Sequence, residues 1–102
     1  MEANFQGAIL VEVDLRKANL EKALFYGANL QGANFREANL QGANLQDANL
    51  RDAILYGVIL QGAILDATNL KGTRLYGATW IDGRRIIDGN YSNLIFEGEE
   101  VN

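Results

Sequence analysis

The 102-residue sequence contains no cysteine, no histidine and no proline, and Ser92 is its one serine. Without cysteine the chain can form neither a disulfide nor a thiolate metal site. Without histidine or cysteine it cannot assemble a Ser-His or Cys-His nucleophile, so carboxylates are the remaining candidates for catalytic groups. We expect those carboxylates to lie on exposed flat walls with no cleft to shift their pKa values, so we expect no enzyme, no metal site and no cofactor.

Long apolar runs are absent as well. The longest uninterrupted aliphatic run, Ala8 to Val11, is far shorter than the roughly 20 residues of a membrane span or the core of a signal peptide. We expect no membrane partner and a cytoplasmic location, with the periplasm or a lumen as the alternative if a leader has been removed. At 102 residues we also expect one domain.

What the sequence has instead is a five-residue repeat, written sixteen times from Ala3 to Asp82 in the form Ala-Asn-Leu-x-Gly. A large apolar residue, the centre, falls at every multiple of five from Phe5 to Trp80. Two residues before each centre comes a small side chain, which is alanine twelve times. The residue just before the centre is asparagine eight times, and the second residue after it is glycine eight times and charged seven times.

This period of five determines the architecture. Residues five apart on a helix are displaced by about 140°, so the centres would spread around the cylinder. In a continuous strand alternate centres would face opposite sides, because five is odd. The chain must therefore turn once per repeat. With each repeat as one side of a square, coils of twenty residues stack with centres and small residues inside.

The pattern of a small residue, Asn or Asp, Leu or Phe and two polar positions resembles the AxLxx pentapeptide-repeat family over about four fifths of the chain. The resemblance implies an all-β fold, a right-handed quadrilateral parallel β-helix, and the handedness agrees with the rule for parallel crossovers. Sixteen repeats make four coils, about 19 Å long at about 4.8 Å per strand. We predict this β-helix over residues 1–82. The Trp-Ile-Asp-Gly stretch from Trp80 also resembles the endings of cyanobacterial members.

The two ends of the repeat region differ. After Asp82 the frame breaks, yet residues 83–102 are too apolar for a disordered tail, and two Asp-Gly pairs predict a short hairpin or an irregular loop. We expect this segment to be a C-terminal cap over Trp80, its apolar members being Ile86, Ile87, Tyr91, Leu94, Ile95 and Phe96. At the other end only Met1 and Glu2 precede the first repeat. We expect an uncapped end there, through which two copies can form a homodimer.

The corners and the asparagines also give expectations. Glycine after the centre suits a type II turn, which needs a positive φ. Charged residues hold the same position at six other corners, so we expect a turn without a positive φ there: Glu12, Lys17, Lys22, Glu37, Asp47 and Asp52. Asn29, Asn49 and Asn69 stack at coil spacing, which allows amide ladders that cross-link successive coils. The other roles are to satisfy local backbone groups at the turns or to bind a ligand, and of these two we favour the local role.

Charge decides between the functions that the resemblance implies. Some family members are acidic rods that imitate DNA and occupy the duplex site of gyrase. The outward residues of the sixteen repeats carry a net charge of only −1, whereas a mimic about 19 Å long needs about 11 charges at one per about 1.7 Å. The basic residues are equally too few for nucleic-acid binding. We therefore favour a non-catalytic scaffold or protein-interaction module with an unknown protein partner, the alternative being a DNA-mimicking gyrase- or topoisomerase-directed protein.

The candidate partner surface is the third side of the square, centred on Leu15, Phe35, Leu55 and Leu75. It is the one side with a net positive charge, +2. Its candidate binding residues stack at coil spacing and are Arg16, Arg36, Ile54, Tyr56, Arg74 and Tyr76. Tyrosine and arginine are enriched in binding hot spots. The other interpretation, which we favour on the sequence alone, is an ordinary ladder, cation–π contact included, that stabilises the wall and binds nothing.

Overall fold

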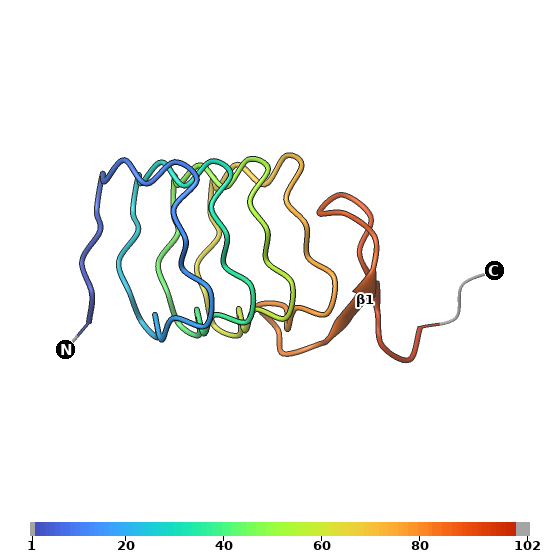
Figure 1. The fold of residues 1–102 in the computed structure, drawn as a ribbon. Coiled ribbons are helices and arrows are strands. Elements are labelled where there is room, and N and C mark those ends of the chain that lie inside the picture. The colour runs from blue at the N-terminus through green and yellow to red at the C-terminus, as the bar shows by residue number, and fades with distance from the viewer. Residues whose placement is uncertain (1, 100–102) are drawn as a thin grey trace.

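The backbone of the computed structural model winds into a stack of coils, with the N-terminus at one end and the C-terminal segment at the other (Figure 1). Parallel bridges pair residues twenty apart, from Asn4 with Leu24 to Ile59 with Thr79. Each coil therefore takes four five-residue repeats, as the period predicts. The structure describes residues 2–99, which contain no helix, so residue 1 of the predicted β-helix and residues 100–102 of the predicted cap lie outside the described part.

Coils are joined by a regular ladder of backbone hydrogen bonds. On the third side, the N–H of Phe35 donates to the carbonyl of Ile54 in the next coil at 2.8 Å. The N–H of Asn34 donates to Val13 in the previous coil at 2.9 Å. The same pattern recurs on each side of the square, so backbone groups provide most of the hydrogen bonds between coils.

Every repeat turns at a corner closed by a backbone hydrogen bond, such as that from the N–H of Ala8 to the carbonyl of Phe5 at 3.0 Å. The third residue of the corner has a positive φ in every repeat but the last. This angle is 66–74° where the residue is glycine, from Gly7 to Gly77, and 57–60° where it is not. The last corner differs, since there Gly83, and not Asp82, takes the positive φ, at 88°.

The prediction that charged corners avoid a positive φ is wrong. All six have φ between 58° and 60°, and Ala67 joins them at 57°: Glu12, Lys17, Lys22, Glu37, Asp47 and Asp52. A left-handed conformation costs an ordinary residue about 1–2 kcal/mol. Each such corner keeps its own closing hydrogen bond, and the ladder fixes where the chain must turn. The constraint of the stack therefore overrides the local preference, and every repeat but the last uses the same type of corner.

The centres and small residues fill the interior as predicted. The side chains of Phe25, Leu30, Phe35 and the Leu centres from 40 to 60 are fully buried, and so are Ala23, Ala33 and Ala43. Threonine interrupts the alanine column twice. The hydroxyl of Thr68 donates to the carbonyl of Leu45 at 2.7 Å, and that of Thr73 to Leu50 at 2.8 Å. Within residues 2–99, no buried side-chain nitrogen or oxygen lacks a partner.

The asparagines before the centres take the predicted local role. Each of the eight accepts a hydrogen bond from the backbone N–H two residues later, as Asn39 does from Gln41 at 3.0 Å. One bond joins side chains of successive coils, from the amide of Asn49 to the oxygen of Asn29 at 3.4 Å. The amides therefore brace corners and do not form a continuous ladder.

Of the two structures expected for the C-terminal segment, a short hairpin or an irregular loop, the hairpin is the one that forms. Strands β1 (Ile86–Asp88) and β2 (Ile95–Phe96) pair antiparallel. The hairpin is hydrogen-bonded to the last coil, because the N–H of Ile86 donates to Ala78 at 2.8 Å and the N–H of Gly77 donates to Ile86 at 2.9 Å. Ile86 is fully buried and Phe96 nearly so, whereas Ile87 is 39% exposed. Successive residues of a strand face opposite sides, so Ile87 cannot share the buried face of Ile86.

The hairpin covers only part of the last coil. On the sides and corners away from it, several backbone N–H groups have no acceptor among residues 2–99: those of Leu65, Ala67, Leu70, Gly72 and Leu75. The centres Leu65 and Leu70 are also only half-buried. The first two sides of this coil, and the third side at Leu75, therefore keep an unpaired backbone edge.

The alanine column gives a direct test of which residues face inward. Ala43 is fully buried, so we expect Ala43→Leu to lower the free energy of unfolding by at least the ~1–3 kcal/mol typical of overpacking. Gln41 is exposed, so Gln41→Leu should change it by less than about 0.5 kcal/mol. Urea unfolding measures both. Greater destabilisation by Gln41→Leu would show that the inside and outside positions are wrongly assigned.

Candidate protein-binding wall

We call the side centred on Leu15, Phe35, Leu55 and Leu75 the Tyr wall. Parallel bridges join Asn34 to Ile54 and Ile54 to Arg74. Two residues after Ile54, the carbonyl of Tyr56 accepts a hydrogen bond from the N–H of Glu37 at 2.8 Å. The carbonyl of Tyr76 likewise accepts one from the N–H of Gly57 at 3.2 Å. The ladder therefore fixes the backbone beneath each tyrosine and places the two one above the other.

Three of the predicted residues touch one another in a column along the wall. The guanidinium of Arg36 lies 5.5 Å from the ring centre of Tyr56. The rings of Tyr56 and Tyr76 meet edge to face, with centres 6.4 Å apart and an angle of 87° between their planes. Contacts of these kinds each contribute about 0.5–1.5 kcal/mol. The column thus contains the cation–π contact that the sequence predicts.

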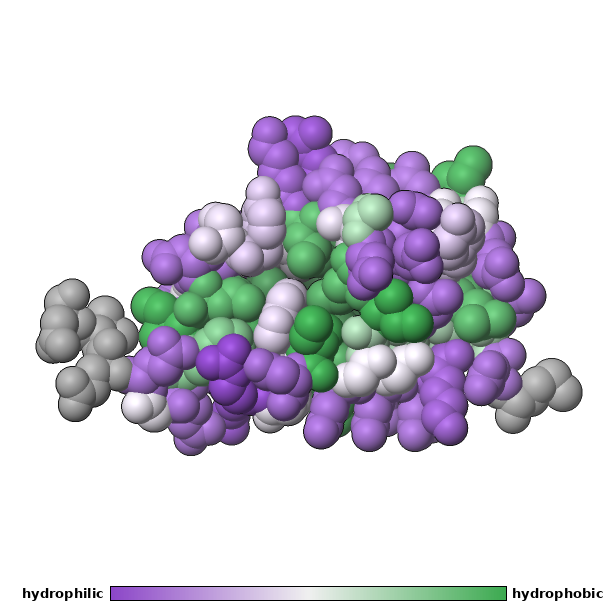
Figure 2. Space-filling model, turned by 180° about the vertical axis from the view of Figure 1, so that it is seen from behind, coloured by the Kyte–Doolittle hydropathy of each residue, from purple (hydrophilic) through white to green (hydrophobic). Residues whose placement is uncertain are grey.

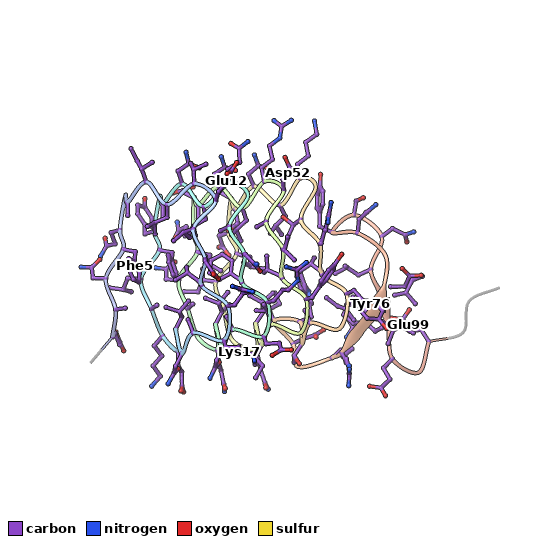
Figure 3. All side chains as sticks on the ribbon, viewed as in Figure 1. Phe5, Glu12, Lys17, Asp52, Tyr76 and Glu99 are labelled. Carbon is purple, nitrogen blue, oxygen red and sulfur yellow. The ribbon has the colours of Figure 1, made fainter. Side chains whose placement is uncertain are left out.

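Tyr76 is the outermost member of this column. It is 64% exposed, whereas Tyr56 is partly buried between its neighbours. Figure 3 shows Tyr76 close to the C-terminal hairpin, while Lys17 lies at a corner nearer the N-terminal end. The exposed ring is therefore supported from below and left open on its outer face.

Arg16 is predicted in the same set, but the structure engages it elsewhere. Its guanidinium forms a two-pronged ion pair with Asp14, with distances of 2.9 Å from Nε to Oδ1 and 2.8 Å from Nη2 to Oδ2. These hydrogen bonds lower the pKa of Asp14 to about 2 and raise that of Arg16. Both side chains are more than half exposed, so solvent screens the pair. The side chain of Arg16 is therefore paired with Asp14 and is not part of the tyrosine column.

The remaining predicted residues flank the column. Ile54 is half-buried and bridges Arg74. Neither Arg36 nor Arg74 has an ion-pair partner within residues 2–99, and neither does Arg85. The wall thus offers arginines that are not neutralised by the described carboxylates.

A hollow of about 230 Å³ lies beside the tyrosine column. Its lining residues are Arg36, Glu37, Tyr56, Gly57, Tyr76, Gly77 and Arg85. Sequence reasoning missed four of these. Gly57 and Gly77 do follow the tyrosines at the corner position of their repeats, so the repeat frame could have found them. Arg85 lies past the break in the frame, where no repeat position locates it.

Apolar side chains are exposed elsewhere on the rod. Ile59 and Ile64 replace asparagine on two successive sides and are 38% and 42% exposed. Figure 2 shows hydrophobic surface in the middle of the rear face, bordered by hydrophilic side chains. β-Branched residues suit a paired strand, which explains their presence in the ladder.

Residues 2–99 show neither a carboxylate cluster nor a long apolar helix. No three Asp or Glu side chains there lie close enough together to hold a metal ion. No helix there is long and apolar enough to cross a membrane.

Comparison with solved structures places this geometry among known proteins. A pentapeptide repeat protein from the thylakoid lumen of Arabidopsis thaliana is 32% identical, with a TM-score of 0.51 over 88% of this chain and 67% of that one. One from Nostoc PCC 7120 is 34% identical, with a TM-score of 0.50 over 76% and 68%. HetL, a pentapeptide repeat protein involved in heterocyst differentiation regulation in the cyanobacterium Nostoc sp. strain PCC 7120, is 36% identical, with a TM-score of 0.45 over 80% of this chain and 42% of its own.

This chain therefore spans less than half the length of HetL and about two thirds of the other two proteins. No match was found among curated proteins. The family model for pentapeptide repeats matches residues 1–36 and 33–72 in eight copies. The stacked coils, the repeat and these matches agree, and the chain belongs to the pentapeptide-repeat family, whose fold is a right-handed β-helix.

Proposed function

We propose that this protein is a non-catalytic interaction module that binds a partner protein through the Tyr wall. The observation that carries this proposal is Tyr76, an aromatic ring 64% exposed and held in place by its contact with Tyr56. Large aromatic side chains and arginines dominate binding energy at protein interfaces. An exposed ring that is already ordered also loses less conformational freedom on binding.

The rest of the fold suits a scaffold. In this proposal the repeat region is a rod of four coils, and the hairpin over its last coil is a partial cap. Each coil contacts mainly its neighbours, so side chains on a wall are presented at fixed spacing along the rod. Two contacts of the hairpin support its role as a cap. Ile86 is buried, and the guanidinium of Arg84 lies 3.7 Å from the ring centre of Phe96.

Truncation of the tyrosines tests the Tyr wall. If affinity purification recovers a partner, Tyr56→Ala together with Tyr76→Ala should weaken its binding by more than about 2 kcal/mol, as for hot-spot residues. The melting temperature should fall by no more than the loss of the two column contacts explains, and the protein should stay folded because both rings lie outside the core. Tyr26→Ala is the matched control, since Tyr26 is 44% exposed on another side. Unchanged binding by the double variant would remove the Tyr wall from the interface.

A different experiment tests the alternative, a gyrase-directed DNA mimic. The walls carry about a tenth of the charge that duplex mimicry requires. We therefore expect no effect of micromolar protein on supercoiling by purified gyrase. Dose-dependent inhibition, or competition with DNA for the enzyme, would favour the mimic over the scaffold.

A homodimer through the N-terminal end is a separate proposal. Phe5 is only partly buried there and stacks on Phe25 with ring centres 5.0 Å apart. A charge at this position should oppose association of two such ends, so Phe5→Lys should shift a dimer towards monomer in sedimentation. Gln6→Lys, which adds the same charge at an exposed position, is the control. Equal masses for the two variants would count against this interface.

A further inference from the structure

The hollow on the Tyr wall exists because two corner residues lack side chains. Gly57 and Gly77 occupy the corner position beside the tyrosines, where the two coils below carry Lys17 and Glu37. Those two adopt φ of 60° without glycine, so the corner geometry alone does not demand glycine at 57 or 77. An added Cβ at Gly57 would meet the nearest atom, Cγ of Glu37, at 3.6 Å, an ordinary contact. Glycine at these two corners therefore leaves the flank of both tyrosine rings open.

The charges around the hollow favour an anion. Arg36 and Arg85 both line it and have no ion-pair partner within residues 2–99. The one carboxylate in the lining, Glu37, lies 4.0 Å from the ammonium of Lys17. A guanidinium stacked on a ring keeps its N–H edge free for a carboxylate, so the contact of Arg36 with Tyr56 does not prevent this.

We propose that this hollow binds an acidic peptide segment of the partner protein. An apolar side chain of the segment packs against Tyr56 and Tyr76, and carboxylates on either side of it pair with Arg36 and Arg85. This inference rests on the proposed function and names the chemistry of the partner. At about 230 Å³ the hollow is smaller than the roughly 300–1,000 Å³ of small-molecule pockets, which favours one inserted side chain over a whole ligand.

The separation of Arg36 and Arg85 along the rod determines how far apart the acidic residues of the segment must be. Arg36 lies two coils below Tyr76. Arg85 directly precedes β1 and forms an antiparallel bridge with Thr79, on the adjoining side of the last coil. Three strand spacings of about 4.8 Å separate them by about 14 Å. In an extended peptide, residues four apart share a face and lie about 13 Å apart. The segment therefore has the form acidic-x-apolar-x-acidic.

The probe is the peptide acetyl-Glu-Ala-Leu-Ala-Glu-amide, titrated into the isotope-labelled protein and followed by NMR. The amide signals of Gly57 and Gly77 should shift and saturate, with a dissociation constant on the order of 1 mM or tighter. The neutral peptide acetyl-Gln-Ala-Leu-Ala-Gln-amide should bind at least about tenfold more weakly, because it cannot form charge-assisted pairs with the arginines. Equal binding of the two peptides, or no shift at either glycine, overturns the proposal.

Variants separate the hollow from the fold. Gly57→Glu should abolish binding of the acidic peptide, because it fills the hollow and adds a negative charge. Gly27→Glu has nearly the same strained φ, 66° against 69° at Gly57, with nothing within 4 Å of the new Cβ, and should bind like the wild type. Arg85→Gln should weaken binding at least about fivefold, and Arg51→Gln, beside Asp52 on another side, should not. Equal binding by Gly57→Glu and Gly27→Glu places the peptide elsewhere.

The peptide titration and the partner assay fail independently. If neither peptide shifts the glycine signals but the tyrosine double variant loses the partner, the Tyr wall stands and the acidic segment is wrong. If the acidic peptide binds but the double variant keeps the partner, the hollow stands and the proposed function of the Tyr wall fails.

Discussion

The structure depends on one interaction, the backbone hydrogen bonding between coils twenty residues apart. Bonds of 2.7–3.2 Å link each coil to the next on all four sides. They require the chain to turn every five residues and to keep a small side chain next to each centre, since four centres share one cross-section. They also set the vertical spacing of the outward residues, so the tyrosine column and the corners of the rod follow from the same ladder.

The sequence alone predicts most of this architecture, because a period of five leaves few solutions for a chain with one apolar and one small residue per repeat. It does not predict the conformation of the corners at Glu12 or Lys17. Local preference argues against a left-handed residue there, and the energy of the stack outweighs that preference. Ile87 is the other error in the fold, since strand alternation turns it away from the cap.

The candidate site is predicted less completely. Coil spacing is enough to bring Arg36, Tyr56 and Tyr76 together, because it depends only on the repeat. It cannot show that Arg16 is held by Asp14, since that depends on side-chain rotamers within one repeat. Nor can it place Arg85, whose position depends on how the hairpin returns to the last coil. The repeat therefore predicts the wall itself, whereas its hollow is completed by Arg85, which lies after the end of the repeat.

Hydrogen exchange of backbone amides tests the ladder most directly, because it compares equivalent centres with and without an acceptor. The N–H groups of Leu45 and Leu50 donate to the next coil at 2.9 and 2.8 Å, whereas those of Leu65 and Leu70 have no acceptor among residues 2–99. We predict that the first two amides exchange only through global unfolding and that the second two exchange much faster. Equal protection of the two pairs, or rapid exchange at Leu45 and Leu50, would contradict the account.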